Sequence, residues 1–222
     1  VLLWLADDQK ALGVFARNED PYCDMAAEIY GRPITKEDKA ERALGKVAIL
    51  GLGYQMGASK FVDTAQLMAG ITIDADMAKR VVAASRSKVW KVTQFWEEQP
   101  APAIEAVQVP QETVTTKYVS WLSADAEGFL FCTLPSGRRL AYPEPEVHAK
   151  MTPWGELRPS LTFMGVNPLN RKWTRQHTYG GSVVENVTQA VARDIMAAAM
   201  VRCERSGVYL PVLSVHDEVI AE

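Results

Sequence analysis

The fold of this chain is decided by the stretch Arg42-Ala43-Leu44-Gly45-Lys46-Val47-Ala48-Ile49-Leu50-Gly51-Leu52-Gly53-Tyr54-Gln55-Met56-Gly57. We predict that most of it is a helix, in which side chains four residues apart share one slowly turning face. That face carries a guanidinium, an ammonium, an apolar side chain and a phenol, on Arg42, Lys46, Leu50 and Tyr54. Over this span the face would be about 18 Å long.

This face suits a nucleoside triphosphate. Like charges one turn apart destabilise an isolated helix by about 0.2–0.5 kcal/mol, and a bound anion would remove that cost. Phosphates would lie on Arg42 and Lys46, and a sugar and base on Leu50 and Tyr54. On its own, however, an Arg and a Lys at this spacing are more often a solvated helix face, because short patterns match by accident.

The last residues of the chain predict two strands joined by an acidic turn. Pro211–Val215 is β-like, His216-Asp217-Glu218 follows, and Val219–Ala221 is again apolar. Adjacent carboxylates repel each other, and a divalent metal ion would offset that repulsion. Two such ions about 3.5–4 Å apart serve phosphoryl transfer in many enzymes. Taken alone, an acidic hairpin turn is more often structural.

A long helix is predicted from Tyr179 to just before Gly207, a typical C-terminal stop. Ser182 and Glu185 match a capping box. We expect a core-facing apolar stripe made of Val184, Val187, Val191, Ile195, Ala198 and Val201. The opposite face is polar, carries Asn186, Gln189 and Arg193, and suits either solvent or nucleic acid.

In this order, the three segments resemble the family A (DNA polymerase I type) DNA polymerases. Arg-x3-Lys followed by Leu50, a glycine and Tyr54 is similar to the family's fingers-helix motif. The form Leu-Gly-Leu-Gly-Tyr-Gln-Met-Gly resembles the bacteriophage and prophage branch. Val-His-Asp-Glu at 215–218 resembles the family's second metal-binding motif, and Glu-Asn-x-x-Gln-Ala-x-Ala-Arg-Asp at 185–194 resembles its palm helix beside the primer–template. The resemblance covers essentially the whole chain.

The resemblance implies an α+β, helix-rich class and a right-hand polymerase fold, with this chain as fingers plus partial palm. We expect a palm–fingers connecting helix at 1–14 and fingers at 15–173, with the nucleotide helix at about 38–54. A partial palm with the metal-binding hairpin would occupy 174–222. The family's first metal-binding motif, Asp-Tyr/Phe-Ser-x-Ile-Glu, comes just before the segment that resembles this chain's start. We therefore expect a fragment that does not polymerise DNA alone.

By resemblance, the complete enzyme adds deoxynucleoside triphosphates to a DNA primer on a template, using two Mg²⁺ ions. Catalytic roles would fall to Asp217, Glu218 and Lys46, the last a candidate proton donor to the leaving pyrophosphate. The nucleotide would be bound by Arg42, Lys46, Leu50 and Tyr54, and Asp217 and Glu218 would serve the metal. DNA would be contacted by Gln189, Arg193, His216 and Tyr54.

Two positions depart from the family pattern. Leu50 stands where the family usually has Phe or Tyr, so we expect altered discrimination against sugar analogues. Tyr22 stands where many relatives have a phosphate-contacting His. A phenol donates a hydrogen bond but carries no positive charge, so a packing role for Tyr22 is at least as plausible.

Two other functions stay open. A non-catalytic nucleic-acid-binding module or accessory replication protein would not need the first metal-binding motif. Such a module would not need an acidic metal hairpin either, so the presence of Asp217 and Glu218 argues against it. A single-subunit RNA polymerase of the related type is the other possibility, although the Tyr-Gln-Met-Gly form looks more like the DNA enzymes. No particular replisome partner is indicated.

Composition adds little about function. The net charge of −3 and the pI near 5.7 do not indicate nucleic-acid binding. The basic cluster Arg171-Lys172-Trp173-Thr174-Arg175 does suit phosphate contact, and solvated surface explains it as well. The three cysteines match no zinc spacing, and no segment predicts a membrane span. We expect a cytoplasmic protein of a bacterial host or a phage-infected cell.

The remaining segments give a coarse secondary structure. Helices are expected at about 1–17, 24–30, 60–69 and 76–98, the last ended by Pro100. Strands are expected at 117–122 and 129–134, and the stretch 143–168 is expected to be irregular. Trp90, Phe95 and Trp96 are predicted to lie in the core.

Overall fold

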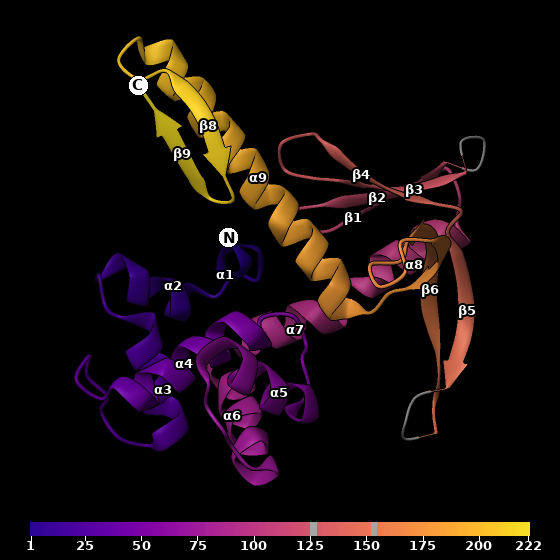
Figure 1. Ribbon diagram of the computed structural model, residues 1–222. Helices are drawn as coiled ribbons and strands as arrows, with labels where there is room; N and C mark the ends of the chain where they lie inside the picture. The colour runs from indigo at the N-terminus through magenta and orange to yellow at the C-terminus, as the bar shows by residue number, and fades with distance from the viewer. Residues whose placement is uncertain (125–127, 152–154) are drawn as a thin grey trace.

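The computed structural model describes residues 1–124, 128–151 and 155–222. Helices fill the first half, and the second half holds the strands and the long helix α9, as Figure 1 shows, which confirms the expected α+β, helix-rich class. The helices are α1 (Leu2–Leu5), α2 (Gln9–Ala16), α3 (Pro21–Tyr30), α4 (Lys39–Leu52), α5 (Ala58–Ala69), α6 (Ala75–Lys88), α7 (Trp90–Glu98), α8 (Pro100–Gln108) and α9 (Gly180–Ser206). The strands are β1 (Thr113–Thr115), β2 (Ser120–Ala124), β3 (Phe129–Thr133), β4 (Arg139–Pro143), β5 (Glu146–Met151), β6 (Leu157–Val166), β7 (Trp173–His177), β8 (Pro211–Val215) and β9 (Glu218–Ala221).

Helix α4, which carries the predicted nucleotide-binding residues, packs against α3, α5 and α6. Its buried side chains belong to one apolar cluster, which comprises Met25, Ile29, Leu44, Val47, Ala48, Leu52, Phe61, Ala65, Ala78, Val81 and Val82. Gly45 allows α3 to approach α4 closely, because a Cβ at this position would overlap the backbone oxygen of Tyr22. The opposite face of α4 stays in solvent.

The strands form two antiparallel sheets, in the orders β1-β2-β3-β4 and β5-β6-β7, and the separate hairpin β8-β9. In the first sheet, Trp121 pairs with Cys132 and Leu130 with Tyr142, and all four are buried. They join one apolar core with side chains of α7, α8 and the first half of α9. The sheets therefore hold the base of α9 in place.

Helix α9 is buried in its first half and exposed in its second. Val184, Val187 and Val191 lie in the core. Ile195 and Val201 are 53% and 41% exposed, so the predicted core-facing stripe is wrong beyond Val191. The second half of α9 runs out from the body of the molecule with hairpin β8-β9 alongside it (Figure 1). Gly207 ends the helix in the left-handed conformation, as predicted.

The structure corrects two helix predictions. Residues 1–17 form two helices, because Asp7 has a φ of 57° and Asp8 starts α2 by accepting a 2.9 Å hydrogen bond from the N–H of Ala11. Residues 76–98 are also two helices, α6 and α7, which meet at Val89 in a non-helical conformation. Pro100 comes after α7 as predicted, but it also starts α8, since the first helical position needs no N–H.

Three further expectations are wrong. The stretch 143–168 contains strands β5 and β6. Pro159 is tolerated there because β7 pairs only with residues 162–166 of β6, so Pro159 lies beyond the reach of β7, at an edge of the sheet. Trp90 is 55% exposed, whereas Phe95 and Trp96 are buried as predicted. The capping box at the start of α9 joins Tyr179 to Ser182, with Tyr179 as N-cap, and does not use Glu185.

No helix in the described ranges is long and apolar enough to cross a membrane.

Candidate nucleotide and nucleic-acid site

A carboxylate ties together the residues just before α4. Asp38 is the N-cap residue, and its Oδ2 accepts hydrogen bonds from the N–H of Thr35 at 2.8 Å and from its hydroxyl at 3.1 Å. Arg32 forms ion pairs with Asp38 and with Glu41. The hydrogen bond from the Thr35 backbone, and then that from Arg32, lower the pKa of Asp38. These contacts set where the helical face begins.

Arg42 and Lys46 are brought together over one aromatic ring. The guanidinium carbon of Arg42 lies 5.2 Å from the ring centroid of Tyr22, and Nζ of Lys46 lies 5.8 Å from it. Both distances fall within cation–π range. Tyr22, which stands where many members of the resembled family have a His, therefore contacts both predicted phosphate-binding cations.

The two cations differ in how firmly they are held. Arg42 donates to Oδ2 of Asp20 from Nε at 2.9 Å and from Nη2 at 2.8 Å. Burial raises the pKa of Asp20, but the hydrogen bonds from Arg42 and from two backbone N–H groups outweigh burial and lower it overall. Lys46 is exposed and has no ion pair with any residue in the described part of the chain. Arg42 is thus a fixed cation and Lys46 a free one.

Leu50 continues this face, and Tyr54 does not. Leu50 is 49% exposed, although Leu44 on the buried side of the same helix is only 1% exposed. Helix α4 ends at Leu52, where the buried Trp96 donates from Nε1 to the carbonyl oxygen of Gly53 at 2.9 Å. Tyr54 therefore lies in a turn after the helix, which corrects the predicted range of 38–54.

Tyr54 is half-buried against the base of α9. Burial, and after it the negative charge of Glu185, raise the pKa of the Tyr54 phenol. The next residue, Gln55, has a φ of 67° and accepts a 2.9 Å hydrogen bond from the N–H of Gly181 on its Oε1. The end of the nucleotide-helix motif thus caps the N-terminus of α9, which is the predicted DNA-contacting helix.

Glycines 180 and 181 make this junction possible. A Cβ on Gly180 would overlap the backbone oxygen of Trp96, and one on Gly181 would overlap that of Tyr54. The role of these glycines is to let α9 begin in contact with both α7 and the turn after α4.

The polar face of α9 is exposed, as predicted, but its residues have different partners. Nδ2 of Asn186 donates to the hydroxyl of Tyr142 at 3.4 Å, and Nε2 of Gln189 donates to Glu185 at 3.1 Å. Arg193 is exposed and lines a shallow pocket with the second half of α9 and the start of β8. The structure therefore leaves Gln189 and Arg193 on an accessible surface.

Sequence reasoning missed one anchoring residue on this helix, Asp194. Its carboxylate accepts hydrogen bonds from the hydroxyl of Ser136 and from Nε of Arg138, both at 2.6 Å. Burial raises the pKa of Asp194, but these two hydrogen bonds outweigh burial and lower it overall. The turn between β3 and β4 is thereby tied to the middle of α9, just where the helix leaves the core.

The predicted hairpin is present, with His216 and Asp217 as its two-residue turn and Val215 paired with Glu218. His216 has a φ of 52°. The side chains at this turn are exposed, and within the described ranges they form no hydrogen bond or ion pair. The structure shows no contact between this turn and the cations of α4.

Asp217 and Glu218 fit a metal ion only in part. Mg²⁺ prefers oxygen ligands and commonly binds through one or two carboxylates together with substrate phosphates. Among the described residues, no group of three or more His, Cys, Asp or Glu side chains could hold a metal ion. A magnesium site at this turn would need further ligands from substrate or from other residues.

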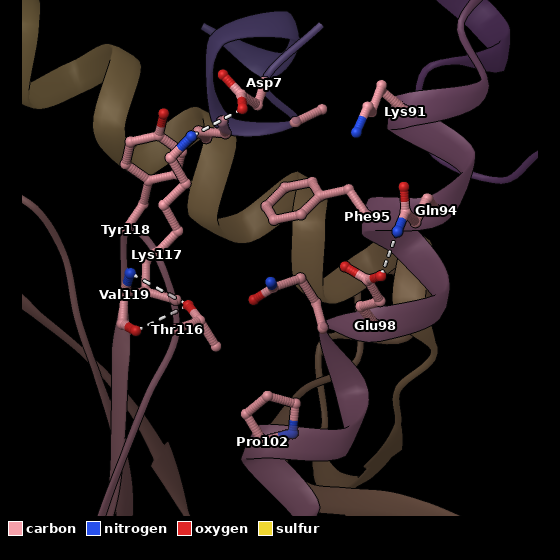
Figure 2. A pocket seen from close by; sticks show the side chains of 13 residues that line it. Asp7, Lys91, Gln94, Phe95, Glu98, Pro102, Thr116, Lys117, Tyr118 and Val119 are labelled. Atoms are coloured by element: carbon pink, nitrogen blue, oxygen red, sulfur yellow. Dashed lines mark hydrogen bonds and ion pairs between the residues drawn. The ribbon is translucent and has the colours of Figure 1, made fainter.

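A separate pocket of about 240 Å³ lies between the α1–α2 junction, α7–α8 and the β1–β2 turn. Figure 2 shows Lys117 bound to Asp7 on one side of it and Gln94 bound to Glu98 on another. Phe95 and Tyr118 supply its apolar surface. None of the predicted site residues lines this pocket.

Comparison with known proteins supports a relation to DNA polymerases. No protein-family model matches the chain. The whole chain is similar to part of the DNA polymerase of Bacillus phage SP02, with 35% identity over 224 aligned positions. The alignment covers 100% of this chain and 33% of the phage enzyme, so the chain spans about one third of the length of this relative.

Proposed function

We propose that this chain is the nucleotide-binding part of a family A DNA polymerase of the phage type, acting in the cytoplasm of a host or infected cell. It would form the fingers and part of the palm of the right-hand fold, with residues 1–14, 15–173 and 174–222 as the parts named above. The observation that carries the proposal is the face of α4 on which Lys46 and Leu50 are exposed and Arg42 is half-buried. The similarity to a phage DNA polymerase supports it independently.

In the proposed complex, the triphosphate lies across Arg42 and Lys46. Asp20 holds the Arg42 guanidinium in place before the nucleotide arrives, so little reorganisation is needed when phosphate oxygens bind. Lys46 has no ion-pair partner in the described ranges, so its ammonium is free to follow the pyrophosphate and to donate a proton to it. Tyr22 keeps both cations on the same side of α4.

The nucleoside would lie further along the same face. Leu50 offers an apolar surface to the sugar, and Tyr54 would stack near the templating base. Because Gln55 caps α9, the base-contacting turn and the DNA-contacting helix form one unit. Gln189 and Arg193 on α9, and His216 on the hairpin, would contact the primer–template. The amide of Gln189 suits minor-groove acceptors, which are similar in all base pairs.

Asp217 and Glu218 would hold Mg²⁺ together with substrate phosphates and ligands from outside the described residues. When bound, two such ions would activate the primer oxygen and stabilise the leaving oxygen. Because the described residues contain no group of three or more side chains that could hold a metal ion, we expect this chain alone not to extend primers. Primer extension by the purified chain would contradict that expectation.

The proposal is tested by calorimetric titration of the chain with Mg²⁺–dTTP and with dTMP. We expect dTTP to bind more tightly, because dTMP lacks the phosphates that lie on the cations. Lys46→Ala should weaken dTTP binding about tenfold or more, as expected for a lost charge-assisted hydrogen bond. Arg80→Ala, which removes an exposed cation from α6, is the matched control and should change nothing.

The opposite result would favour the non-catalytic alternative. If dTTP binds no better than dTMP and Lys46→Ala behaves like Arg80→Ala, α4 does not bind a triphosphate. Binding of primer–template without nucleotide binding would then identify the chain as a nucleic-acid-binding module.

A further inference from the structure

The turn between β6 and β7 is held by hydrogen bonds from its own asparagines. Oδ1 of Asn167 accepts hydrogen bonds from the N–H of Leu169 at 2.9 Å and of Asn170 at 3.4 Å, and Oδ1 of Asn170 accepts one from the N–H of Lys172 at 3.0 Å. The backbone adds a bond from the N–H of Asn167 to the carbonyl oxygen of Lys172 at 2.8 Å. The turn therefore presents its side chains in a defined arrangement.

The segment that contains this turn carries cations and no acidic residue of its own. Residues 157–184 contain four Lys and Arg side chains and no Asp or Glu, in a chain whose net charge is −3. Arg158 pairs with Glu156, and Arg175 pairs with Glu146 at 2.6 Å. Arg171 and Lys172 are exposed and have no ion pair within the described ranges. Only these two members of the predicted basic cluster are free to bind an anion.

The same turn exposes apolar side chains beside the free cations. Trp173 is 55% exposed, and Val166, its cross-strand partner, is 56% exposed. Leu169 at the turn itself is 94% exposed. A flat indole ring next to two unpaired cations is complementary to a ligand that is both anionic and aromatic.

We propose that this turn, residues 166–173, binds single-stranded DNA. One base stacks on the indole of Trp173, and Arg171 and Lys172 contact the phosphates on either side of it. Single-strand-binding proteins combine aromatic platforms with cations in this way, and each stacked base contributes without regard to sequence. In a duplex the bases are already stacked on each other, so the ring would have no free base face to bind.

This interaction is separate from the proposed nucleotide site. No residue of α4 or of hairpin β8-β9 takes part in it, so the turn would bind DNA whether or not α4 binds a nucleotide. Variants at Lys46 should leave it unchanged. The two proposals can therefore fail independently.

The test is fluorescence anisotropy of a labelled oligothymidine with the whole chain. Trp173→Ala should weaken binding about fivefold to 100-fold, the range for loss of one stacked base, and Trp173→Phe should recover most of it. The double variant Arg171→Ala/Lys172→Ala should weaken binding and reduce the slope of log affinity against log salt by about 1.4, since each phosphate contact on a single strand contributes about 0.7.

Matched controls come from α6 and α7. Trp90→Ala removes a tryptophan that is also 55% exposed and also lies beside a lysine, Lys91. Lys79→Ala/Arg80→Ala removes the same total charge. Both controls should bind oligothymidine like the unmodified chain. The proposal is overturned if the turn variants do no more than these controls, if the chain does not bind the oligonucleotide, or if duplex DNA binds as tightly with the same dependence on Trp173.

Discussion

Oε1 of Gln55 accepts a 2.9 Å hydrogen bond from the backbone N–H of Gly181, which lies 126 residues further along the chain. It joins the end of the proposed nucleotide-binding motif to the first turn of the proposed DNA-contacting helix. The first N–H groups of a helix have no partner within the helix, so an acceptor from elsewhere stabilises its start. Any movement of the turn after α4 is thereby coupled to the base of α9.

This bond predicts a difference between two substitutions at one position. Gln55→Ala keeps the strained left-handed backbone but leaves the Gly181 N–H unpaired, so it should lower the free energy of unfolding by about 1–3 kcal/mol. Gln55→Glu keeps an acceptor and adds a negative charge at a helix N-terminus, so it should retain stability. Urea unfolding measures both. Equal stability of the two variants would show that the hydrogen bond contributes nothing.

Close contact at the start of α9 predicts a severe effect from one methyl group. In Gly180→Ala the new Cβ would overlap the backbone of Trp96, which cannot move as a flexible side chain would. We expect a loss of about 3 kcal/mol or more, at the upper end for overpacking. Gly57→Ala is the control, since a Cβ there meets nothing within 4 Å. Thermal unfolding of the two variants should therefore differ clearly, and similar melting temperatures would contradict the packing described.

Tyr22 should affect nucleotide binding through its ring and not through its hydroxyl. In Tyr22→Phe both cations keep their aromatic neighbour, so the affinity for Mg²⁺–dTTP should stay within about twofold. In Tyr22→Ala the cations lose an interaction worth about 0.5–1 kcal/mol each at exposed sites, and the affinity should fall by about threefold to tenfold. If Tyr22→Phe proves as weak as Tyr22→Ala, the hydroxyl itself contacts the nucleotide.

Asp20 predicts a pH dependence of stability. The pKa of Asp20 in the folded protein is lower than its ordinary value, so its contribution is complete above the unfolded pKa of about 3.9. That contribution is lost as the pH falls through the folded pKa. Asp20→Asn keeps a good N-cap for α3 but removes the charge beside Arg42. The free energy of unfolding of Asp20→Asn should fall below that of the unmodified chain by the largest amount at pH 7, and this difference should shrink towards pH 2. A difference that does not change with pH would rule out the Asp20–Arg42 ion pair as its cause.

Two leucines on α4 separate stability from binding. Leu44 is 1% exposed, and Leu44→Ala should cost about 2–5 kcal/mol of stability. Leu50 is 49% exposed, and Leu50→Ala should change stability by less than about 0.5 kcal/mol. Under the proposed function, Leu50→Ala should nevertheless weaken dTTP binding measurably. No effect of Leu50→Ala on either quantity would mean that this leucine is simply solvated surface.

Much of the fold follows from local patterns in the sequence. The presence of α3, α4 and α5, the C-terminal ends of α3, α5 and α9 and the acidic hairpin were predictable, because glycine stops and apolar periodicity are local signals. The helix breaks at Asp7 and Val89 were not, because neither position carries a proline or a glycine. Strands β5 and β6 were missed because Pro159 suggests irregular structure, and only the pairing limits of β7 show why it is tolerated.

The candidate site was predictable in its residue types but not in its contacts. Arg42, Lys46 and Leu50 lie on one face of α4, as their spacing implies, with Lys46 and Leu50 exposed and Arg42 half-buried. The contact of both cations with the ring of Tyr22, the anchoring of Arg42 by Asp20 and the capping of α9 by Gln55 depend on pairs distant in the sequence. Periodicity gives no information about such pairs, and it also placed Tyr54 on a helix that has already ended.

The most direct test of the central proposal is photo-crosslinking of 8-azido-dATP to the whole chain with Mg²⁺, followed by peptide mapping. The account predicts that the label lies on the peptide around Leu50 to Gln55, that unlabelled dTTP prevents it, and that Lys46→Ala reduces it while Arg80→Ala does not. Labelling spread over other elements, or labelling that dTTP does not prevent, would show that α4 is not the nucleotide-binding surface.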